Sequence, residues 1–230
     1  MKVTLLQHTP EPEKLAAAAA RVCYSSQSAG EIMEALTTEK IQKRISDCIK
    51  KGHLSIVEHV SFTFSIEEIS RVTSHQLVRH RIASYSQQSQ RYVKMGGSPE
   101  FVTPPRIRDD EPMKEKFDAF MGDAMNFYNE MVGRGIPCED ARYILPQALF
   151  TTLVVTMNAR ELLHFFSLRC CKKAQWEIRK LAYAMLRAVM KVAPAIFEQA
   201  GPSCLSGECP SADMKCYEKM SRLKPGGLGT

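Results

Sequence analysis

Hydrophobic and polar positions follow two different periods along this chain, and these periods predict strands and helices in mixed order. Within residues 59–70, the apolar side chains from Val60 to Ile66 alternate with polar ones, which predicts a strand with one buried face. Residues 37–52 instead repeat apolar side chains at helical spacing and stop at a glycine. The first is predicted as a strand and the second as a helix.

The same signals extend over the rest of the chain. Further strands are predicted at 3–8, 150–157 and from Gln90 to Met95. Helices are predicted at 13–24, 70–80, 111–135, 158–170 and 174–199, with Pro194 bending or ending the last, and one or two helical turns at 138–146. Asn158 followed by Glu161 has the spacing of a capping box.

Helices interspersed with a few non-adjacent strands indicate an α+β fold. The sequence contains no internal repeat and no linker between two domains. Residues 1–200 are therefore predicted to form a single domain. Residues 201–230 are rich in Gly, Pro, Ser and Cys and are predicted to be an irregular tail.

Composition narrows the class of protein. The chain has 230 residues, 44% of them apolar, a formal charge of +6 and a pI near 8.9, which suits a protein that handles anions but is too mild for a dedicated nucleic-acid binder. Because no apolar run approaches the roughly 20 residues that span a bilayer, and acid and proline follow the first apolar stretch, we expect a cytoplasmic protein. Its eight cysteines are then expected to be thiols.

Basic groups crowd into residues 79–92, "RHRIASYSQQSQRY", among hydroxyl and amide side chains. Like charges this close repel one another, which indicates an anionic ligand, although a solvated basic face is the alternative for any basic triplet. The chain has no GxGxxG or GxxxxGK[ST] loop, so a phosphate would have to be held by side chains and helix ends.

This segment resembles the signature of the flavin-dependent thymidylate synthases. That signature is RHR, then seven residues, a serine, and an arginine two positions further on, and Arg79, His80, Arg81, Ser89 and Arg91 are all in register. The resemblance continues upstream in "HLSIVEH" and "QLVRHR", and downstream in "ARYILP", "MNARELLHFFSLR" and "AQWEIR". It covers roughly residues 10–200.

The resemblance implies a fold, an activity and partners. The fold would be a small, mostly antiparallel sheet packed against several helices, in a homotetramer whose active sites are shared between subunits. The enzyme would methylate dUMP to dTMP with 5,10-methylenetetrahydrofolate as carbon donor, NADPH as reductant and FAD as cofactor, without an enzyme nucleophile. Neither nucleic acid nor a membrane is expected as a partner, and no metal is expected.

The resemblance also assigns positions to FAD. These are Ser55, Arg79, His80, Arg81, Gln87, Asn158, Arg160 and His164. Gln87 replaces a glutamate of some relatives, and His164 and Lys173 replace their asparagine and histidine. His53 is a further candidate for contact with flavin or folate, with a core histidine as the alternative. Asn158 could cap its helix and still touch the cofactor.

For dUMP the matching positions are Gln76, Arg79, Gln87, Ser89, Arg91, Arg142 and Arg169. Ser89 and Arg91 alternate on a presumed extended segment and would face one phosphate. Without the resemblance, Arg142 would be interpreted as an exposed helix arginine. Arg169 ends an apolar helix and therefore needs a polar partner; in the family this position contacts uracil and favours ionisation at N3, so it is the predicted catalytic residue.

Nucleophilic alternatives are Ser89, Cys23, Cys170 and Cys171, which would need a base or a lowered pKa. We expect Ser89 to bind phosphate and the cysteines to be structural. In the tail, Cys204, Cys209 and Cys216 lack a CxxC pair, so a zinc site is the weaker alternative to a flexible tail or a buried thiol cluster.

Two other functions compete with the synthase. A nucleic-acid-binding module would use the basic segment, but basic residues do not form one stripe and aromatic residues are not interleaved with them. A nucleotide-binding flavoprotein reductase without methyl transfer would differ only in lacking the arginines assigned to dUMP.

Overall fold

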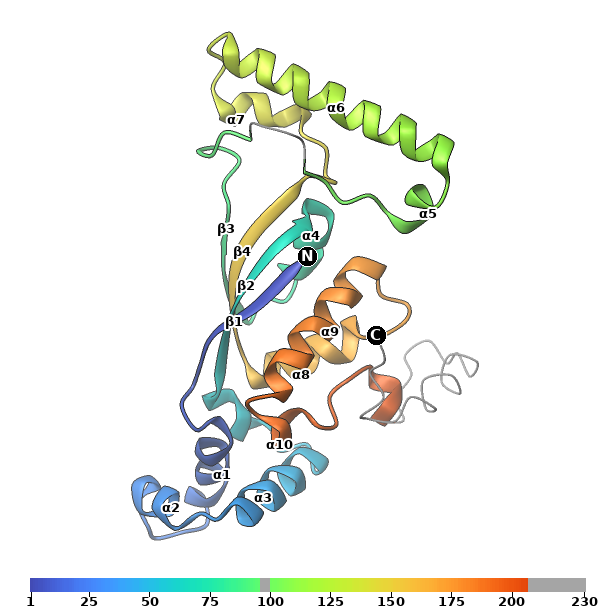
Figure 1. Ribbon diagram of the computed structural model, residues 1–230. Coiled ribbons are helices and arrows are strands. Elements are labelled where there is room, and N and C mark those ends of the chain that lie inside the picture. Colours follow the sequence, from blue (N-terminus) through green and yellow to red (C-terminus); the bar gives the residue numbers. More distant parts are fainter. Residues whose placement is uncertain (96–99, 207–230) are drawn as a thin grey trace. The chain divides into compact units, whose positions relative to one another are not determined.

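The structure is a computed structural model, and it describes residues 1–95 and 100–206 (Figure 1). The strands are β1 Lys2–His8, β2 Ser61–Ser70, β3 Ala83–Gln87 and β4 Phe150–Asn158. The α-helices are α1 Pro12–Val22, α2 Ala29–Ala35, α3 Thr38–Lys50, α4 Arg71–Leu77, α5 Pro105–Arg108, α6 Glu111–Gly133, α7 Cys138–Ala141, α8 Ala159–Arg169, α9 Trp176–Met190 and α10 Pro194–Phe197. Short 3-10 helices are η1 Leu54–His59, η2 Arg142–Ile144 and η3 Ser203–Ser206.

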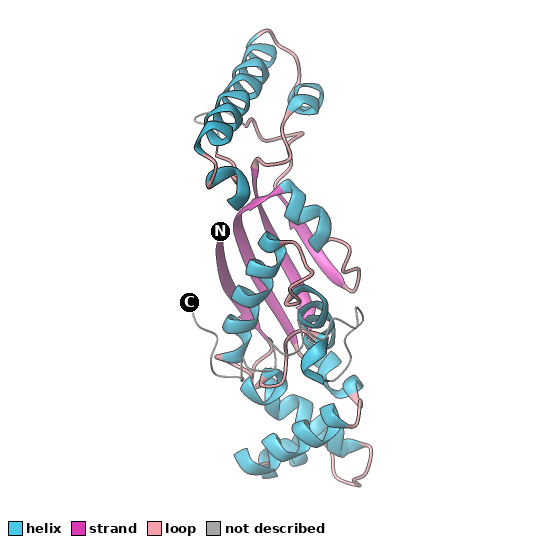
Figure 2. Ribbon diagram, turned by 90° about the vertical axis from the view of Figure 1, so that its right-hand side faces the viewer, coloured by secondary structure: helices cyan, strands magenta, loops and turns pink. Residues whose placement is uncertain are grey.

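The four strands form one sheet in the order β1-β2-β4-β3 (Figure 2). The backbone N–H of Ala159 donates to Val60 O at 2.7 Å, and that of Arg71 donates to Leu149 O at 3.3 Å. One end of β4 therefore meets the opposite end of β2, so the central pair is antiparallel. The predicted α+β fold with a small antiparallel sheet is confirmed.

The strand predicted from Gln90 to Met95 is wrong. Strand β3 ends at Gln87, and the Gln88 N–H still donates to Thr152 O of β4 at 2.9 Å. After that bond the chain turns, because the Val93 N–H donates back to Ser89 O at 2.9 Å. A further bond, from the Met95 N–H to the Tyr128 hydroxyl at 3.1 Å, holds the end of this segment against α6.

The chain divides into two compact units, each assembled from separate segments. The first contains Met1–Lys2, Ser65–Arg79 and Tyr85–Val154, and the second contains Val3–Phe64, His80–Ser84 and the chain from Val155 onward. All four strands contribute residues to both units. The single domain predicted for residues 1–200 stays a prediction.

In the second unit a row of aromatic rings forms the centre of the core. The rings of Phe62 on β2 and Phe197 on α10 lie 5.5 Å apart, and Phe166 on α8 lies 5.9 Å from Phe197. Phe165, the neighbour of Phe166, continues the row towards His80, whose ring lies 4.9 Å away in an edge-to-face arrangement. Helix α8 is therefore fixed between the core and the candidate site.

In the first unit the core lies under α6. Met125 and Tyr128 of α6 pack with Ala141 and Leu149. Alternate burial along β2 is interrupted at Glu68, whose φ of 59° is left-handed, after which Ile69 and Ser70 are both buried. This interruption shifts the alternation of buried and exposed positions by one residue, as a β-bulge does.

Several local predictions are confirmed and some elements were not predicted. Helix α3 ends before Gly52, whose φ is 76°, and the predicted last helix ends before α10 begins at Pro194. Helix α2, which was not predicted, begins with a reciprocal capping box between Ser28 and Glu31. Among the described residues, no helix is long and apolar enough to cross a membrane.

Truncating the central ring of the aromatic row should weaken the second unit. Because Phe166 is fully buried, Phe166→Ala is expected to lower the free energy of unfolding by about 3–5 kcal/mol, and Phe166→Leu by less. Urea denaturation followed by far-UV circular dichroism measures this change. Phe120→Ala, whose ring is 66% exposed on α6, is the control, and it should change stability by no more than about 0.5 kcal/mol. Equal losses in the two alanine variants would contradict the packing described here.

Candidate active site

The residues predicted for the site fall into two groups, one in each unit. The second unit carries Ser55, His80, Arg81, Asn158, Arg160, His164 and Arg169. The first unit carries Gln76, Arg79, Gln87, Ser89, Arg91 and Arg142.

His80 is the most buried residue of the predicted set, with its side chain 4% exposed. Its Nδ1 lies 3.1 Å from Glu161 Oε1, and its Nε2 accepts a hydrogen bond from Arg169 Nε at 3.1 Å. Glu161, Phe165 and Arg169 stand at positions i, i+4 and i+8 of α8, so they share one face of the helix. The imidazole of His80 lies over this face.

Burial sets the charge state of this cluster. Desolvation lowers the pKa of His80 by more than the hydrogen bond to the Glu161 carboxylate raises it. Desolvation also lowers the pKa of Arg169, but a guanidinium stays protonated in proteins and can only donate. A ring nitrogen that accepts from it carries no proton, so the neutral imidazole holds its hydrogen on Nδ1 and donates it to Glu161.

The start of α8 is fixed by Asn158. Its Oδ1 accepts a hydrogen bond from the Glu161 N–H at 2.9 Å, so the predicted N-cap is confirmed. The Glu161 carboxylate of the predicted capping box bonds His80. The role of Glu161 beside His80 was not predicted, although an acid at i−4 from Phe165 on an apolar helix face could have signalled it.

Exposed polar groups of η1 lie beside the first turn of α8. Arg160 Nη1 pairs with Glu58 Oε1 of η1, and Ser55 is exposed on the same short helix. His53, just before η1, is exposed, so the alternative of a core histidine is wrong. Arg81 is exposed as well, and so is Arg79. His80, which lies between them in the sequence, is buried.

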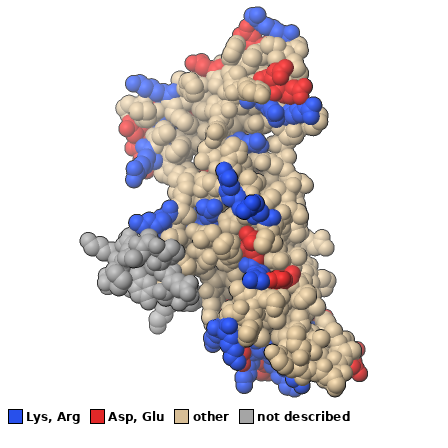
Figure 3. Space-filling model, turned by 180° about the vertical axis from the view of Figure 1, so that it is seen from behind, with Lys and Arg blue, Asp and Glu red and all other residues tan. Residues whose placement is uncertain are grey.

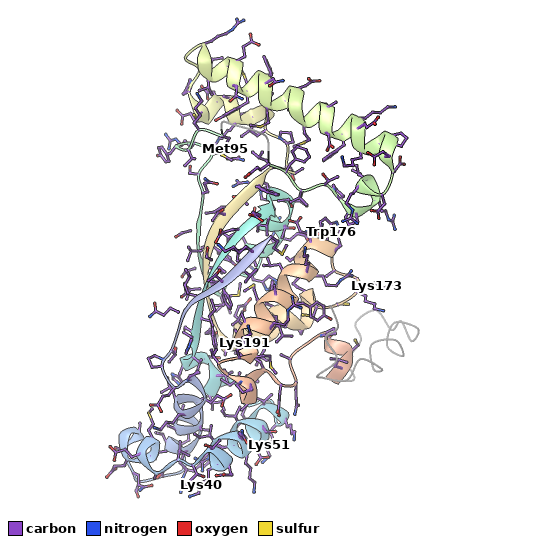
Figure 4. The ribbon with its side chains drawn as sticks, in the orientation of Figure 1. Lys40, Lys51, Met95, Lys173, Trp176 and Lys191 are labelled. Atoms are coloured by element: carbon purple, nitrogen blue, oxygen red, sulfur yellow. The ribbon has the colours of Figure 1, made fainter. Side chains whose placement is uncertain are left out.

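The end of α8 leads into a short loop. His164, on the last turns of α8, is exposed, and its ring centroid lies 5.8 Å from that of His80. Lys173 lies in the loop between α8 and α9, with its side chain exposed, and Trp176 opens α9 (Figure 4).

In the first unit, Glu139 accepts hydrogen bonds from two of the predicted arginines. Arg91 Nε donates to Glu139 Oε2 at 2.6 Å, and Arg142 Nε donates to the Glu139 carbonyl at 3.1 Å. Ser89 Oγ accepts from the Arg91 N–H at 3.1 Å. The predicted extended arrangement of Ser89 and Arg91 is wrong, because a turn places them together. Glu139 was not predicted from the sequence.

The remaining residues of the first unit differ in burial. Gln87 is half-buried and its Nε2 donates to Thr151 Oγ1 on β4 at 3.0 Å. Gln76 on α4 is half-buried, whereas Arg79 is exposed. Burial, and then the neighbouring positive charge of Arg142, lower the pKa of Arg71.

The first unit also contains a cavity of about 280 Å³. Its walls include Glu68, Gln88, Thr151 and Met95. The residues predicted for dUMP are not among the described residues that line it. The cavity therefore adds nothing to the assignment of those residues.

The six cysteines in the described ranges 1–95 and 100–206 are free thiols. Cys170 is buried, and burial raises the pKa of its thiol to about 12. Cys204, the first cysteine of the predicted tail cluster, is buried and lies within the short helix η3. Cys209 and Cys216 lie outside the described residues.

Comparison with known proteins identifies the family. Residues 4–195 match the family model described as "Thymidylate synthase complementing protein". The flavin-dependent thymidylate synthase of Geobacter sulfurreducens is 53% identical, over 94% of this chain and 94% of that protein. The enzyme of the same name from Clostridium tetani is 45% identical, over 94% and 93%.

A solved structure agrees. The flavin-dependent thymidylate synthase of Helicobacter pylori, in complex with FAD and dUMP, superposes with a TM-score of 0.71 and 28% sequence identity. The match covers 87% of this chain and 100% of that chain. This chain belongs to the flavin-dependent thymidylate synthase family.

Proposed function

We propose that this chain methylates dUMP to dTMP, taking the carbon from 5,10-methylenetetrahydrofolate and reducing equivalents from NADPH. The family match over residues 4–195, with the whole five-position signature inside it, carries the proposal. We further propose that it works in the cytoplasm as a homotetramer whose active sites are shared between subunits.

The exposed groups of the second unit fit FAD. Ser55 and Arg160 offer a hydroxyl and a guanidinium beside the first turn of α8, and Arg81 offers a second guanidinium. Such donors suit phosphate oxygens and the carbonyl edges of a flavin. When bound and reduced, FAD would supply the hydride that completes the methyl group. The protein's own task is to hold and orient the partners.

The turn at Ser89 fits the phosphate of dUMP. The guanidinium groups of Arg91 and Arg142 both bond Glu139, the backbone N–H of Arg91 bonds the Ser89 hydroxyl, and both arginines are exposed. A phosphate monoester carries nearly two negative charges near pH 7 and offers three acceptor oxygens, so it would compete with Glu139 for Arg91.

Arg169 would face the uracil ring and stabilise negative charge as it develops there. Electrostatic activation of this kind needs no covalent bond to the enzyme. The buried thiol of Cys170 supports this view, because a pKa of about 12 keeps it protonated at neutral pH and unable to attack.

The two competing functions differ in measurable ways. Lys and Arg side chains are scattered in several groups over the face seen in Figure 3, with acidic groups among them, which disfavours a nucleic-acid-binding module. A reductase without methyl transfer would oxidise NADPH but form no dTMP.

The test of the proposed function uses the purified full-length protein. It should bind FAD, turn yellow, and form dTMP from dUMP only when methylenetetrahydrofolate and NADPH are both present, as measured by liquid chromatography. NADPH oxidation without dTMP would support the reductase instead. A protein that neither retains nor rebinds FAD would overturn both readings.

Removing the guanidinium of Arg169 should slow methylation without emptying the flavin site. We expect Arg169→Ala to reduce kcat for dTMP formation by about 100- to 1,000-fold, the range for one donor to developing negative charge. FAD content, read from absorbance, should stay the same. Arg187→Ala, an exposed arginine of α9, is the matched control. Full dTMP synthesis by Arg169→Ala would refute the assigned role.

Changes at Arg91 and Glu139 should move dUMP affinity in opposite directions. Losing a charge-assisted hydrogen bond costs about 1.5–3 kcal/mol, so Arg91→Ala should raise the Kd for dUMP about 10- to 150-fold. Glu139→Gln removes the competing charge and should lower that Kd a few-fold. Isothermal titration at fixed ionic strength measures both, with exposed Arg108→Ala as control. Weaker binding by Glu139→Gln would show that the carboxylate supports the site.

A further inference from the structure

We propose that Glu161 and His80 are positioning residues for Arg169, and that Glu161 acts through the imidazole ring. The proposal rests on the proposed function in one respect, namely that Arg169 faces the uracil ring.

The three side chains form a continuous chain of hydrogen bonds. Glu161 Oε1 meets His80 Nδ1 at 3.1 Å, and Arg169 Nε meets His80 Nε2 at 3.1 Å. The side chains of His80 and Glu161 are only 4% and 7% exposed. The ring of Phe165 packs edge-to-face against the imidazole, with the two ring centroids 4.9 Å apart, so the imidazole has little freedom to turn.

The direction of each bond is fixed by chemistry. Arg169 Nε can only donate, so His80 must present a bare Nε2. A neutral imidazole then carries its proton on Nδ1, and the carboxylate of Glu161 is the acceptor that keeps it there. Without Glu161, the Nδ1 proton would lose its acceptor, and the Nε2–H tautomer, in which two N–H groups face each other between His80 and Arg169, would no longer be disfavoured by that bond.

Fixing Nε fixes the plane of the whole guanidinium, because its nitrogens are coplanar with the central carbon. The Nη groups of Arg169 are thereby aimed before the substrate binds. Preorganised donors stabilise developing charge without reorientation during the reaction. Loss of the Glu161–His80–Arg169 hydrogen-bond chain, here called the relay, should therefore lower kcat more than it weakens dUMP binding.

Two substitutions at one position separate the acceptor from mere bulk. Glu161→Gln keeps an oxygen that can accept the Nδ1 proton, whereas Glu161→Leu does not. We expect Glu161→Leu to lower kcat about 10- to 100-fold, as for other partners that orient a catalytic group. The KM for dUMP should change less than kcat, and Glu161→Gln should restore most of the activity.

A double-mutant cycle tests whether Glu161 acts through Arg169. In an Arg169→Ala background, adding Glu161→Leu should change kcat less than about twofold, because the group it positions is gone. A merely structural role would give the same fractional loss in both backgrounds. Glu177→Leu, which removes another buried acid from the second unit, is the matched control, with activities normalised to FAD-bound protein. An equal loss in Glu177→Leu and Glu161→Leu would overturn the proposal.

The tautomer of His80 can be read without any turnover. Solid-state NMR of the 15N-histidine-labelled full-length protein with FAD should show His80 protonated at Nδ1, with its signals assigned by their loss in His80→Gln. The same signal is then compared between the wild-type protein and the two Glu161 variants. A shift of the proton to Nε2 in Glu161→Leu supports the proposed hydrogen-bond chain. If the leucine variant does not fold, retention of the proton on Nδ1 in Glu161→Gln supports it. An Nε2–H or doubly protonated ring in the wild-type protein would overturn it. Wild-type protein that shows the expected tautomer but makes no dTMP would refute the proposed function alone.

Discussion

The stacking of α8 on the aromatic core is the constraint on which the second unit depends. Phe166 faces the row of rings that includes Phe62 and Phe197, while Phe165 turns the adjoining side of the helix towards His80. Because consecutive residues of a helix point about 100° apart, one helix serves the core and the site together. The same packing that stabilises the fold therefore sets the position of Glu161 and Arg169.

Much of the fold could be predicted from local patterns. Alternation predicted β2 up to Ile66, and helical spacing with caps predicted α3, α6 and α8. Helix α2 has one buried residue, Ile32, so it leaves almost no apolar periodicity. The segment after β3 is held at its end by a bond from the Met95 N–H to Tyr128, 33 residues further along, which no local pattern contains.

In the candidate site, too, local sequence placed residues but did not show which residues they contact. The resemblance placed the arginines of the signature but left their partners open, because an ion pair depends on which segments the fold brings together. Glu139 pairs with Arg91 across 48 residues, and Glu161 meets His80 across 81. Both acids were visible in the sequence as ordinary members of helical segments. Burial and distance are what distinguish them.

The ion pair of Arg91 with Glu139 has a consequence for the end of the catalytic cycle. In the proposed function, dUMP and dTMP carry the same phosphate, so contacts to that group hold the product as firmly as the substrate. A carboxylate within reach of Arg91 offers the guanidinium another partner when the phosphate leaves, so the arginine need not return to water alone. In the proposed function, Glu139 would thereby limit product inhibition, while lowering the affinity for the incoming nucleotide.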